Sequence, residues 1–255
     1  MPIRKTLIVL LVSVAVALGS CVPGSRGTKD PSRPPEPLEG SGTLDRLPFK
    51  EGWYGLYFQE EKIGYSHFKI VAEGKTFALS TDAAMRFKTK KRVNKISMTE
   101  KTVVEPDLSL VSLTRTERQN EKELNTHAKV VNDKLVVDFL AEGEKMHREF
   151  PVKGAVYHTG ATGLMPRLKG LRQGVVHKFT VLNLQAQVVD EVTQEISQVL
   201  GRPGPNDAVW KVRSTFRGRS DDSWFDRNGR CVLEKLMDGA LISIAEDEKT
   251  AKKLP

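Results

Sequence analysis

Hydrophobic and polar residues alternate along much of the chain after residue 50, and this period of two predicts β-strands. The alternation is clearest from Lys75 to Lys88, where one face carries the apolar side chains Phe77, Leu79, Ala83, Met85 and Phe87. Such a run is typical of a half-buried strand in an antiparallel sheet, with one face on the core and one in water.

Further strands are expected on both sides of this run. The aromatic segment from Trp53 to Phe68 predicts a hairpin, and strand-like runs follow at 93–104, 110–118, 124–130, 135–139, 175–182, 186–196 and 209–216. A last hairpin is expected to turn at Asp226–Gly229. Because crossover helices are missing between these runs, a doubly wound parallel sheet is excluded.

One segment shows a helical period instead. Leu164, Leu168 and Leu171 lie three to four residues apart, with Pro166 near the start and Gly174 after the end. A sheet of roughly ten such strands twists and curves instead of lying flat. The predicted fold class is therefore mainly β: a strongly curved antiparallel sheet, or half-barrel, with one short helix across its concave side.

The N-terminus has a different character. Basic Arg4 and Lys5 precede an apolar run over 7–18 and the small residues Gly19 and Ser20, which is the layout of a secretory signal. The alternatives are an uncleaved membrane helix, for which the run falls short of ~20 apolar residues, and a buried strand, which would not carry these flanks.

The chain is therefore divided into three parts. Residues 1–20 are expected to be a lipoprotein signal peptide, 21–48 a flexible tether, and 49–255 the half-barrel domain. The tether is predicted because 22–48 carries few large apolar residues and six prolines: Pro23, Pro31, Pro34, Pro35, Pro37 and Pro48.

The charge of the chain gives limited information about its binding partners. The net charge of +8 falls to +6 when Arg4 and Lys5 leave with the signal peptide, which suits an anionic surface. The densest basic cluster, Arg86–Lys95, either meets anionic lipid headgroups or is the solvated face of a strand pair. No nucleic-acid partner is expected, because the excess is moderate and a secreted protein does not meet nucleic acid.

The sequence shows no convincing catalytic or metal site. Cys231 and a histidine would be needed for a thiol nucleophile, but Cys231 follows a turn within an apolar alternation, which favours a buried structural thiol. The five histidines lack metal-ligand spacing, so no metal, no cofactor and no enzymatic activity is expected: His67, His127, His147, His158 and His177. Tyr157–Thr159, just before the helix, is either a polar site or an ordinary loop.

Large apolar side chains are the remaining candidates for a binding site. Most of them are expected in the core, but a half-barrel that is not filled by its helix leaves a space for an acyl chain or another apolar molecule. The residues expected to line that space are Phe77, Met85, Phe87, Phe139, Leu164, Leu168, Trp210 and Phe216.

Two resemblances add to this picture. Leu18–Cys21 resembles the lipobox of bacterial lipoproteins, which implies cleavage before Cys21, diacylation of Cys21 and no intramolecular disulfide for Cys231. Val22 and Pro23 follow Cys21 where Asp would resemble an inner-membrane retention signal. The resemblance therefore implies the periplasmic face of the outer membrane.

The second resemblance concerns the domain itself. Trp53–Tyr57, Lys62–His67, Gly170–Gly174 and Trp224–Arg230 resemble points in an uncharacterised bacterial domain often found ahead of transglutaminase-like domains. It implies a half-barrel related to LolA and LolB, whose concave apolar face accommodates acyl chains. The matched residues do not include a catalytic site.

Three functions follow as expectations. The first is a non-enzymatic, lipid-anchored envelope protein that binds a lipid or other apolar ligand in its concave side. The second is an interaction module that docks a separately encoded envelope enzyme, such as a transglutaminase-like protein. The third is a hydrolase that uses Cys231.

Overall fold

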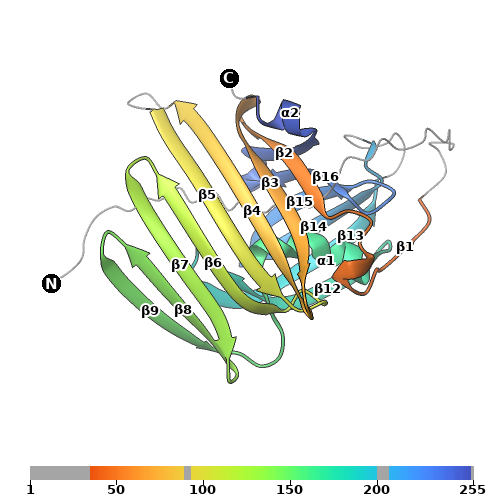
Figure 1. The fold of residues 1–255 in the computed structure, drawn as a ribbon. Coiled ribbons are helices and arrows are strands. Elements are labelled where there is room, and N and C mark those ends of the chain that lie inside the picture. Colours follow the sequence, from red (N-terminus) through yellow and green to blue (C-terminus); the bar gives the residue numbers. More distant parts are fainter. Residues whose placement is uncertain (1–34, 89–92, 200–206, 254–255) are drawn as a thin grey trace.

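A single large curved sheet dominates the computed structural model, which describes residues 35–88, 93–199 and 207–253 (Figure 1). The described residues form a 15-stranded sheet and a separate two-stranded pair. The strand order across the large sheet is β10-β12-β13-β14-β15-β16-β17-β2-β3-β4-β5-β6-β7-β8-β9, and the only parallel neighbours in it are β10 and β12. The predicted curved antiparallel sheet is confirmed, with more strands than expected.

Eight consecutive strands form one half of the sheet as a meander. They are β2 Glu51–Phe58, β3 Glu61–Glu73, β4 Thr76–Lys88, β5 Val93–Val104, β6 Leu110–Gln119, β7 Lys122–Val131, β8 Lys134–Ala141 and β9 Glu144–Pro151. Asn132 and Asp133 turn between β7 and β8 with positive φ angles of 46° and 58°, which suits a two-residue hairpin. Strand β9 was not predicted, because nearly its whole length is exposed and it shows no apolar alternation.

The second half of the sheet returns to the first through β17. Its strands are β10 Val156–His158, β12 Val176–Asn183, β13 Val188–Gln198, β14 Trp210–Phe216, β15 Arg219–Phe225, β16 Cys231–Leu236 and β17 Leu241–Glu246, and β17 pairs with β2. The predicted turn at Asp226–Gly229 joins β15 to β16 and is confirmed. The Asp226 carboxylate stabilises it by accepting hydrogen bonds from the backbone N–H of Asn228 at 2.8 Å and of Arg230 at 2.9 Å.

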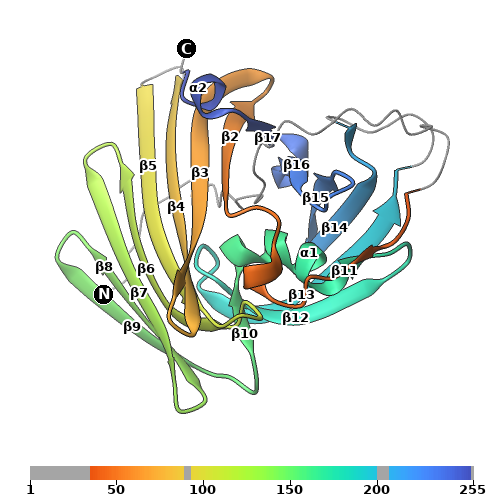
Figure 2. The same ribbon diagram turned by 45° about the vertical axis from the view of Figure 1, so that its right-hand side comes forward.

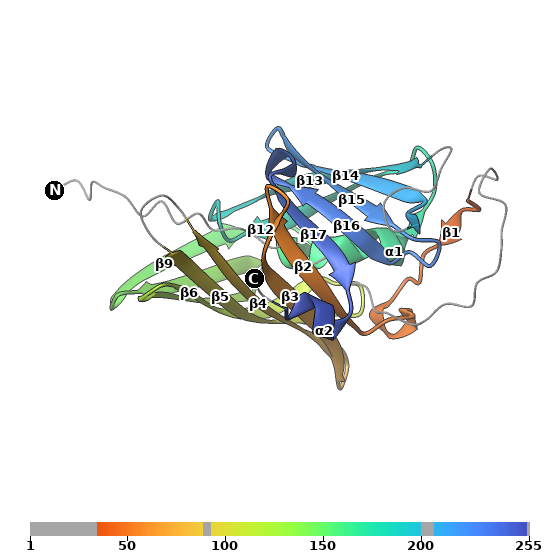
Figure 3. The ribbon, with the colours of Figure 1, turned by 90° about the horizontal axis from the view of Figure 1, so that it is seen from above.

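The sheet curls so that its two halves face each other (Figures 2 and 3). Its end strands, β9 and β10, do not pair with each other among the described residues. Side chains of β10, β12 and the β12–β13 turn instead pack on the inner face of β6–β8 in one apolar cluster that includes Leu113, Val137, Phe139, Val156, Leu182 and Leu184. The sheet is therefore rolled up without closing into a barrel, a shape that we call the scroll. Side-chain packing of β10 and β12 on β6–β8 holds it, and β9 extends past this contact.

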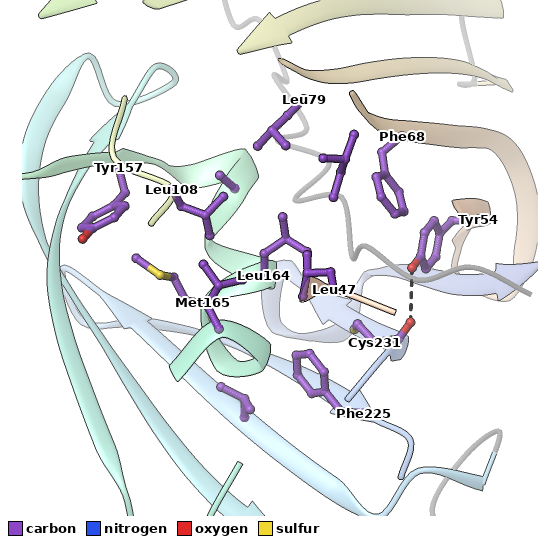
Figure 4. Close-up of a cluster of buried hydrophobic side chains, with 14 of the residues drawn as sticks. Leu47, Tyr54, Phe68, Leu79, Leu108, Tyr157, Leu164, Met165, Phe225 and Cys231 are labelled. Atoms are coloured by element: carbon purple, nitrogen blue, oxygen red, sulfur yellow. Dashed lines mark hydrogen bonds between the residues drawn. The ribbon is translucent and has the colours of Figure 1, made fainter. Parts of the chain in front are cut away.

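The lower part of the scroll, as seen in Figure 2, is filled by three segments from different parts of the chain. They are the N-terminal stretch with η1 (Leu44–Arg46), the β5–β6 loop, and η2 (Thr159–Leu164) with α1 (Met165–Lys169). Together they bury a set of apolar side chains that we call the plug: Leu44, Leu47, Phe49, Leu108, Ala161, Leu164, Met165 and Leu168. Figure 4 shows several of them against Tyr54, Phe68 and Phe225 of the sheet.

The expected tether ends earlier than predicted. From Pro35 onward the chain packs on the domain: β1 (Leu38–Glu39) pairs with β11 (Gly170–Leu171), and Leu44 and Leu47 are buried. The prolines and glycines of this stretch led to the prediction of a tether. Its four large apolar side chains nevertheless pack on the main core: Leu38, Leu44, Leu47 and Phe49. Residues 1–34, which include the expected signal peptide and Cys21, lie outside the described residues.

The helix across the concave side is confirmed but is shorter than its leucine spacing indicated. Pro166 lies in the first turn of α1, and the chain leaves the helix at Gly170, whose φ of 101° few other residues adopt. Leu171 is therefore on β11 and not on the helix. A side chain at Gly40 is also excluded, since its Cβ would lie 2.2 Å from the Leu168 carbonyl oxygen.

The C-terminal helix α2 (Glu248–Ala251) lies on the outer face over β2 and β3 (Figure 3). Glu246 anchors this end, because its carboxylate accepts hydrogen bonds from Tyr57 at 2.6 Å and Lys62 at 2.7 Å. Burial and the bond to Glu246 raise the pKa of Tyr57 to about 12. Gly55 makes room for this contact, since a Cβ there would lie 2.5 Å from Glu246 Oε2.

The plug's contribution to stability can be measured at Leu164, which is 0% exposed. We expect Leu164→Ala to lower the free energy of unfolding by ~3 kcal/mol, because it leaves a cavity in the close-packed interior. Leu140→Ala, at a leucine that is 44% exposed, is the control and should change it by less than ~0.5 kcal/mol. Urea unfolding measures both, and equal effects would contradict the plug's role.

Candidate functional site

The eight apolar candidate residues divide into two groups. Phe77, Met85, Leu164, Leu168 and Trp210 are buried in the main core cluster, and Phe139 is buried in the cluster that closes the scroll. Phe87 and Phe216 are only half-buried and pack on the edge of the main cluster. Six of the eight are therefore buried by other side chains, and the contact of any of them with a ligand stays a prediction.

The half-buried phenylalanines mark one end of the scroll. Strands β2, β4 and β14 run in the same direction through the antiparallel order, so their last residues lie at the same end. Phe58, Phe87 and Phe216 occupy those positions or the one before, and all three are half-buried against the main core. We call this end, which lies away from α1 in Figure 2, the far end. It combines large apolar surface with partial exposure, as binding sites for apolar molecules do.

Polar side chains occupy the middle of the inner face between the plug and the far end. Thr81, Glu100, Arg115 and Thr126 are direct cross-strand partners in one row over β4–β7, and all are buried. Other strands add buried polar residues to this polar belt: Ser66, His158, Gln194, Ser223, Glu234 and Ser243. Buried polar groups are costly unless they are paired, so a belt of them inside an apolar core needs an explanation.

Four ionisable side chains of the belt form a connected chain, which we call the Glu100 cluster: Glu117, Arg115, Glu100 and His158. Arg115 Nη2 donates to Glu117 Oε2 at 2.7 Å, and Arg115 Nη1 lies 3.8 Å from Glu100 Oε2. On the other side, His158 Nδ1 lies 3.3 Å from Glu100 Oε1. All four side chains are 8% exposed or less, so water screens their interactions weakly.

His158 joins one end of the sheet to the middle of its other half. It lies on β10, whereas Glu100 lies on β5, and it directly precedes η2 of the plug. Burial lowers the pKa of the imidazole; the Glu100 carboxylate opposes this shift and the Arg115 guanidinium adds to it. Gly160 allows the close fit, because a Cβ there would lie 2.9 Å from His158 Cε1.

Several buried polar atoms of the inner face lack a hydrogen-bond partner among the described residues. They are both ring nitrogens of His158, the hydroxyls of Ser66 and Ser243, and Gln194 Oε1. The Gln194 amide nitrogen is used, since it donates to the Thr162 carbonyl at 3.2 Å and to the Ser214 hydroxyl at 3.1 Å. Unpaired buried polar atoms commonly mark places where a water, an ion or a ligand binds.

Cys231 has the environment of a structural thiol. It is 0% exposed, and its Sγ lies 3.5 Å from the Leu233 carbonyl oxygen. Burial and the nearby Glu234 carboxylate raise the pKa of the thiol well above its ordinary value, which opposes formation of the nucleophilic thiolate. Its own carbonyl accepts a hydrogen bond from the Tyr54 hydroxyl at 3.2 Å (Figure 4).

The described part of the chain offers no cluster of three or more histidine, cysteine or carboxylate side chains arranged to hold a metal ion. Over the same residues, no helix has the length and apolar character required to cross a bilayer. Of the basic cluster around the β4–β5 turn, Arg86, Lys88 and Lys95 are exposed, and the residues between 89 and 92 lie outside the described ranges.

The sequence pattern marked His158, within Tyr157–Thr159, as a candidate polar residue but gave no indication of its partners. Glu100, Arg115 and Glu117 lie at inward positions of β5 and β6, where apolar residues such as Met98 and Leu113 are also buried. A charged residue at a position where the alternation predicts a buried side chain can be recognised in the sequence. This signal could be interpreted only when the structure placed β10 against β6 and His158 next to Glu100 on β5. These strands are far apart in the sheet order.

Comparisons with known proteins support the architecture. No protein-family model and no curated protein matches the sequence. The structure is similar to the crystal structure of a β-barrel-like protein of the domain of unknown function DUF1849 from Brucella abortus, with a TM-score of 0.53 and 13% identity. That match covers 77% of this chain and 95% of the other.

A protein of the DUF1089 family from Pseudomonas aeruginosa matches with a TM-score of 0.37 and 12% identity, over 66% of this chain and 87% of the other. At these identities the similarity to the DUF1849 structure concerns the fold alone. The chain has a barrel-like fold similar to that of a domain of unknown function. This agrees in coarse form with the uncharacterised domain that the sequence resembles.

The depressed pKa of His158 predicts a pH dependence of stability. Below about pH 6.5 the unfolded chain binds a proton that folded His158 resists, so the free energy of unfolding falls as the pH drops from there towards the lower folded pKa. His158→Gln should flatten this fall, measured by urea unfolding at several pH values. If the variant keeps the wild-type slope, the assignment is wrong.

His147 on β9 provides a control of opposite sign for that experiment. Its hydrogen bonds to Asp138 and Glu149 raise its pKa, so its contribution is present at low pH and is lost as the pH rises through the raised value. His147→Gln should therefore steepen the loss of stability on acidification.

The buried thiol gives a third prediction. At neutral pH, Cys231 of the folded protein should resist iodoacetamide, and unfolding in urea should make it reactive, because burial keeps it protonated and covered. Mass spectrometry of the peptide that contains Cys231 measures the modification. Rapid labelling of the folded protein would favour the hydrolase alternative.

Proposed function

We propose that this chain is a non-enzymatic, lipid-anchored protein of the bacterial envelope that holds an apolar molecule bearing a polar group inside its scroll. The observation that carries the proposal is the arrangement of the inner face: half-buried phenylalanines at the far end lead to a belt with unpaired buried polar atoms. The phenylalanines of the far end can contact an apolar chain, and the polar belt can bind a polar head group. The similar barrel-like fold supports the architecture that this requires.

The anchor is proposed at Cys21, on the lipobox resemblance, at the periplasmic face of the outer membrane. Two acyl chains hold a protein durably to a bilayer, whereas one chain does not. The described chain begins at Pro35, whose carbonyl accepts a hydrogen bond from Gln198 on β13 at 3.1 Å. The intervening ~14 residues span at most ~50 Å when fully extended, so the scroll would remain near the leaflet.

The absence of catalysis is part of the proposal. The thiol that could act as a nucleophile is buried and its pKa is raised. The connected ionisable residues of the Glu100 cluster are themselves buried at 8% exposure or less. These environments favour binding over turnover.

Strand β9 supports the second candidate function, docking of an envelope protein. It ends the sheet order, so one backbone edge has no strand beside it among the described residues, and its side chains are exposed along most of its length. Such an edge accepts an added strand from another chain. Its charged residues, including Glu144, Lys145 and Arg148, also discourage unspecific pairing, so a partner would need matching charges.

Acylation and ligand binding can be tested on the protein from its own membrane. We expect native mass spectrometry to show a chain that begins at Cys21 and carries acyl groups, together with a noncovalent apolar molecule. Cys21→Ser should abolish acylation and the cleavage that depends on it. A mature chain that retains residues 1–20 would contradict the anchor, and a chain without a bound molecule would contradict the ligand.

A further inference from the structure

The ion pairs of the Glu100 cluster join acidic and basic side chains in unequal number. The cluster contains the carboxyl groups of Glu100 and Glu117, one guanidinium, and the imidazole of His158, whose pKa is lowered by burial. Two carboxyl groups therefore face a single guanidinium, so the cluster contains one more acidic than basic side chain. A buried charge without a partner of opposite sign is rare, because the protein interior solvates it poorly and the free-energy cost is high.

A second observation points to the place where compensation would occur. His158 is 2% exposed, and neither of its ring nitrogens has a hydrogen-bond partner, although Nδ1 lies 3.3 Å from Glu100 Oε1. Both oxygens of Glu100 already have protein contacts, since Thr102 donates at 3.2 Å to Oε1, the oxygen nearest His158, and Arg115 approaches Oε2 at 3.8 Å. The unused hydrogen-bonding capacity therefore lies with His158, beside Glu100.

The alternative that the cluster is only structural explains less. Arg115 and the two glutamates could fix the register of β5 and β6 as a buried ion pair and its neighbour. That role does not require a histidine from β10, at one end of the sheet, with both nitrogens unpaired. Nor does it explain why Ser243 and Gln194, on other strands of the same inner face, also carry unpaired atoms.

We propose that the Glu100 cluster is the head-group subsite for the molecule held in the scroll, and that it selects a cationic or hydroxyl head over a carboxylate. The inference rests on the proposed function. An amine would supply the missing positive charge beside Glu100, and a hydroxyl would donate to a carboxylate or to the imidazole. A carboxylate would add like charge where water screens poorly, and Arg115 is already held by Glu117.

The selectivity can be measured with dodecylamine, dodecanol and dodecanoate, which share one alkyl chain and differ in the head. Isothermal titration of the full-length protein below the micellar concentration, at about pH 7.5, keeps the amine charged and the acid ionised. We expect the amine and the alcohol to bind at least roughly tenfold more tightly than the acid. This comparison needs no variant, so it does not depend on the folding of a substituted core.

Variants locate the selectivity in the cluster. Glu117→Gln should reduce the amine-to-acid preference, and the double variant Glu100→Gln with Glu117→Gln should reverse it, because Arg115 is then free to bind the acid. Glu149→Gln is the matched control, since Glu149 is exposed on β9 and pairs with Lys134 at 2.8 Å. It should leave the preference unchanged.

The outcomes separate this inference from the proposed function. Tight binding of all three probes without discrimination, tighter binding of the acid, or a preference that both glutamate variants retain would overturn the subsite and leave the apolar-ligand function standing. If no probe binds to the wild-type protein, both are overturned. Discrimination that is lost with Glu117→Gln and kept with Glu149→Gln supports both.

Discussion

The architecture depends on filling the inner face of a sheet that curls on itself. A twisted sheet of 15 strands exposes more apolar surface on its concave side than α1, with five residues, could cover. Three segments cover it together: the N-terminal stretch around Leu44 and Leu47, the β5–β6 loop with Leu108, and η2–α1 with Leu164 and Met165. The close packing of this plug against both halves of the sheet fixes the curvature on which the other features depend.

The plug covers only one part of the inner face, and the candidate site lies on the remaining part. The segments of the plug occupy the lower part of the scroll in Figure 2. The polar belt and the half-buried phenylalanines lie further along the strands, as Thr81 and Phe87 do on β4. A core that served stability alone would place aliphatic side chains at the positions of Glu100, Arg115 and Glu117. Because His158 comes from β10, at one end of the sheet, the Glu100 cluster is complete only when the sheet has curled.

The sequence predicted the local structure well where the signal is local. Period-two alternation identified β4 and its inward residues Phe77 and Met85, and turn residues identified the hairpin at Asp226–Gly229. It failed where the decisive contact is distant in sequence. Leu44 and Leu47 are buried in an apolar cluster whose other members come from distant parts of the chain. The Glu100–His158 contact forms only when the sheet has curled, so neither contact leaves a local pattern. Strand β9 was missed for the opposite reason, because an exposed edge strand has no buried face to create alternation.

The most direct test is a high-resolution crystal structure of the protein taken from its own membrane without added apolar compounds, with attention to the density next to His158, Ser243 and Gln194. The account predicts elongated density of a non-protein molecule that extends from the polar belt towards Phe58 and Phe87, with its polar end within hydrogen-bonding distance of His158. Density for ordered waters alone, in an interior otherwise filled by the protein's own side chains, would contradict it.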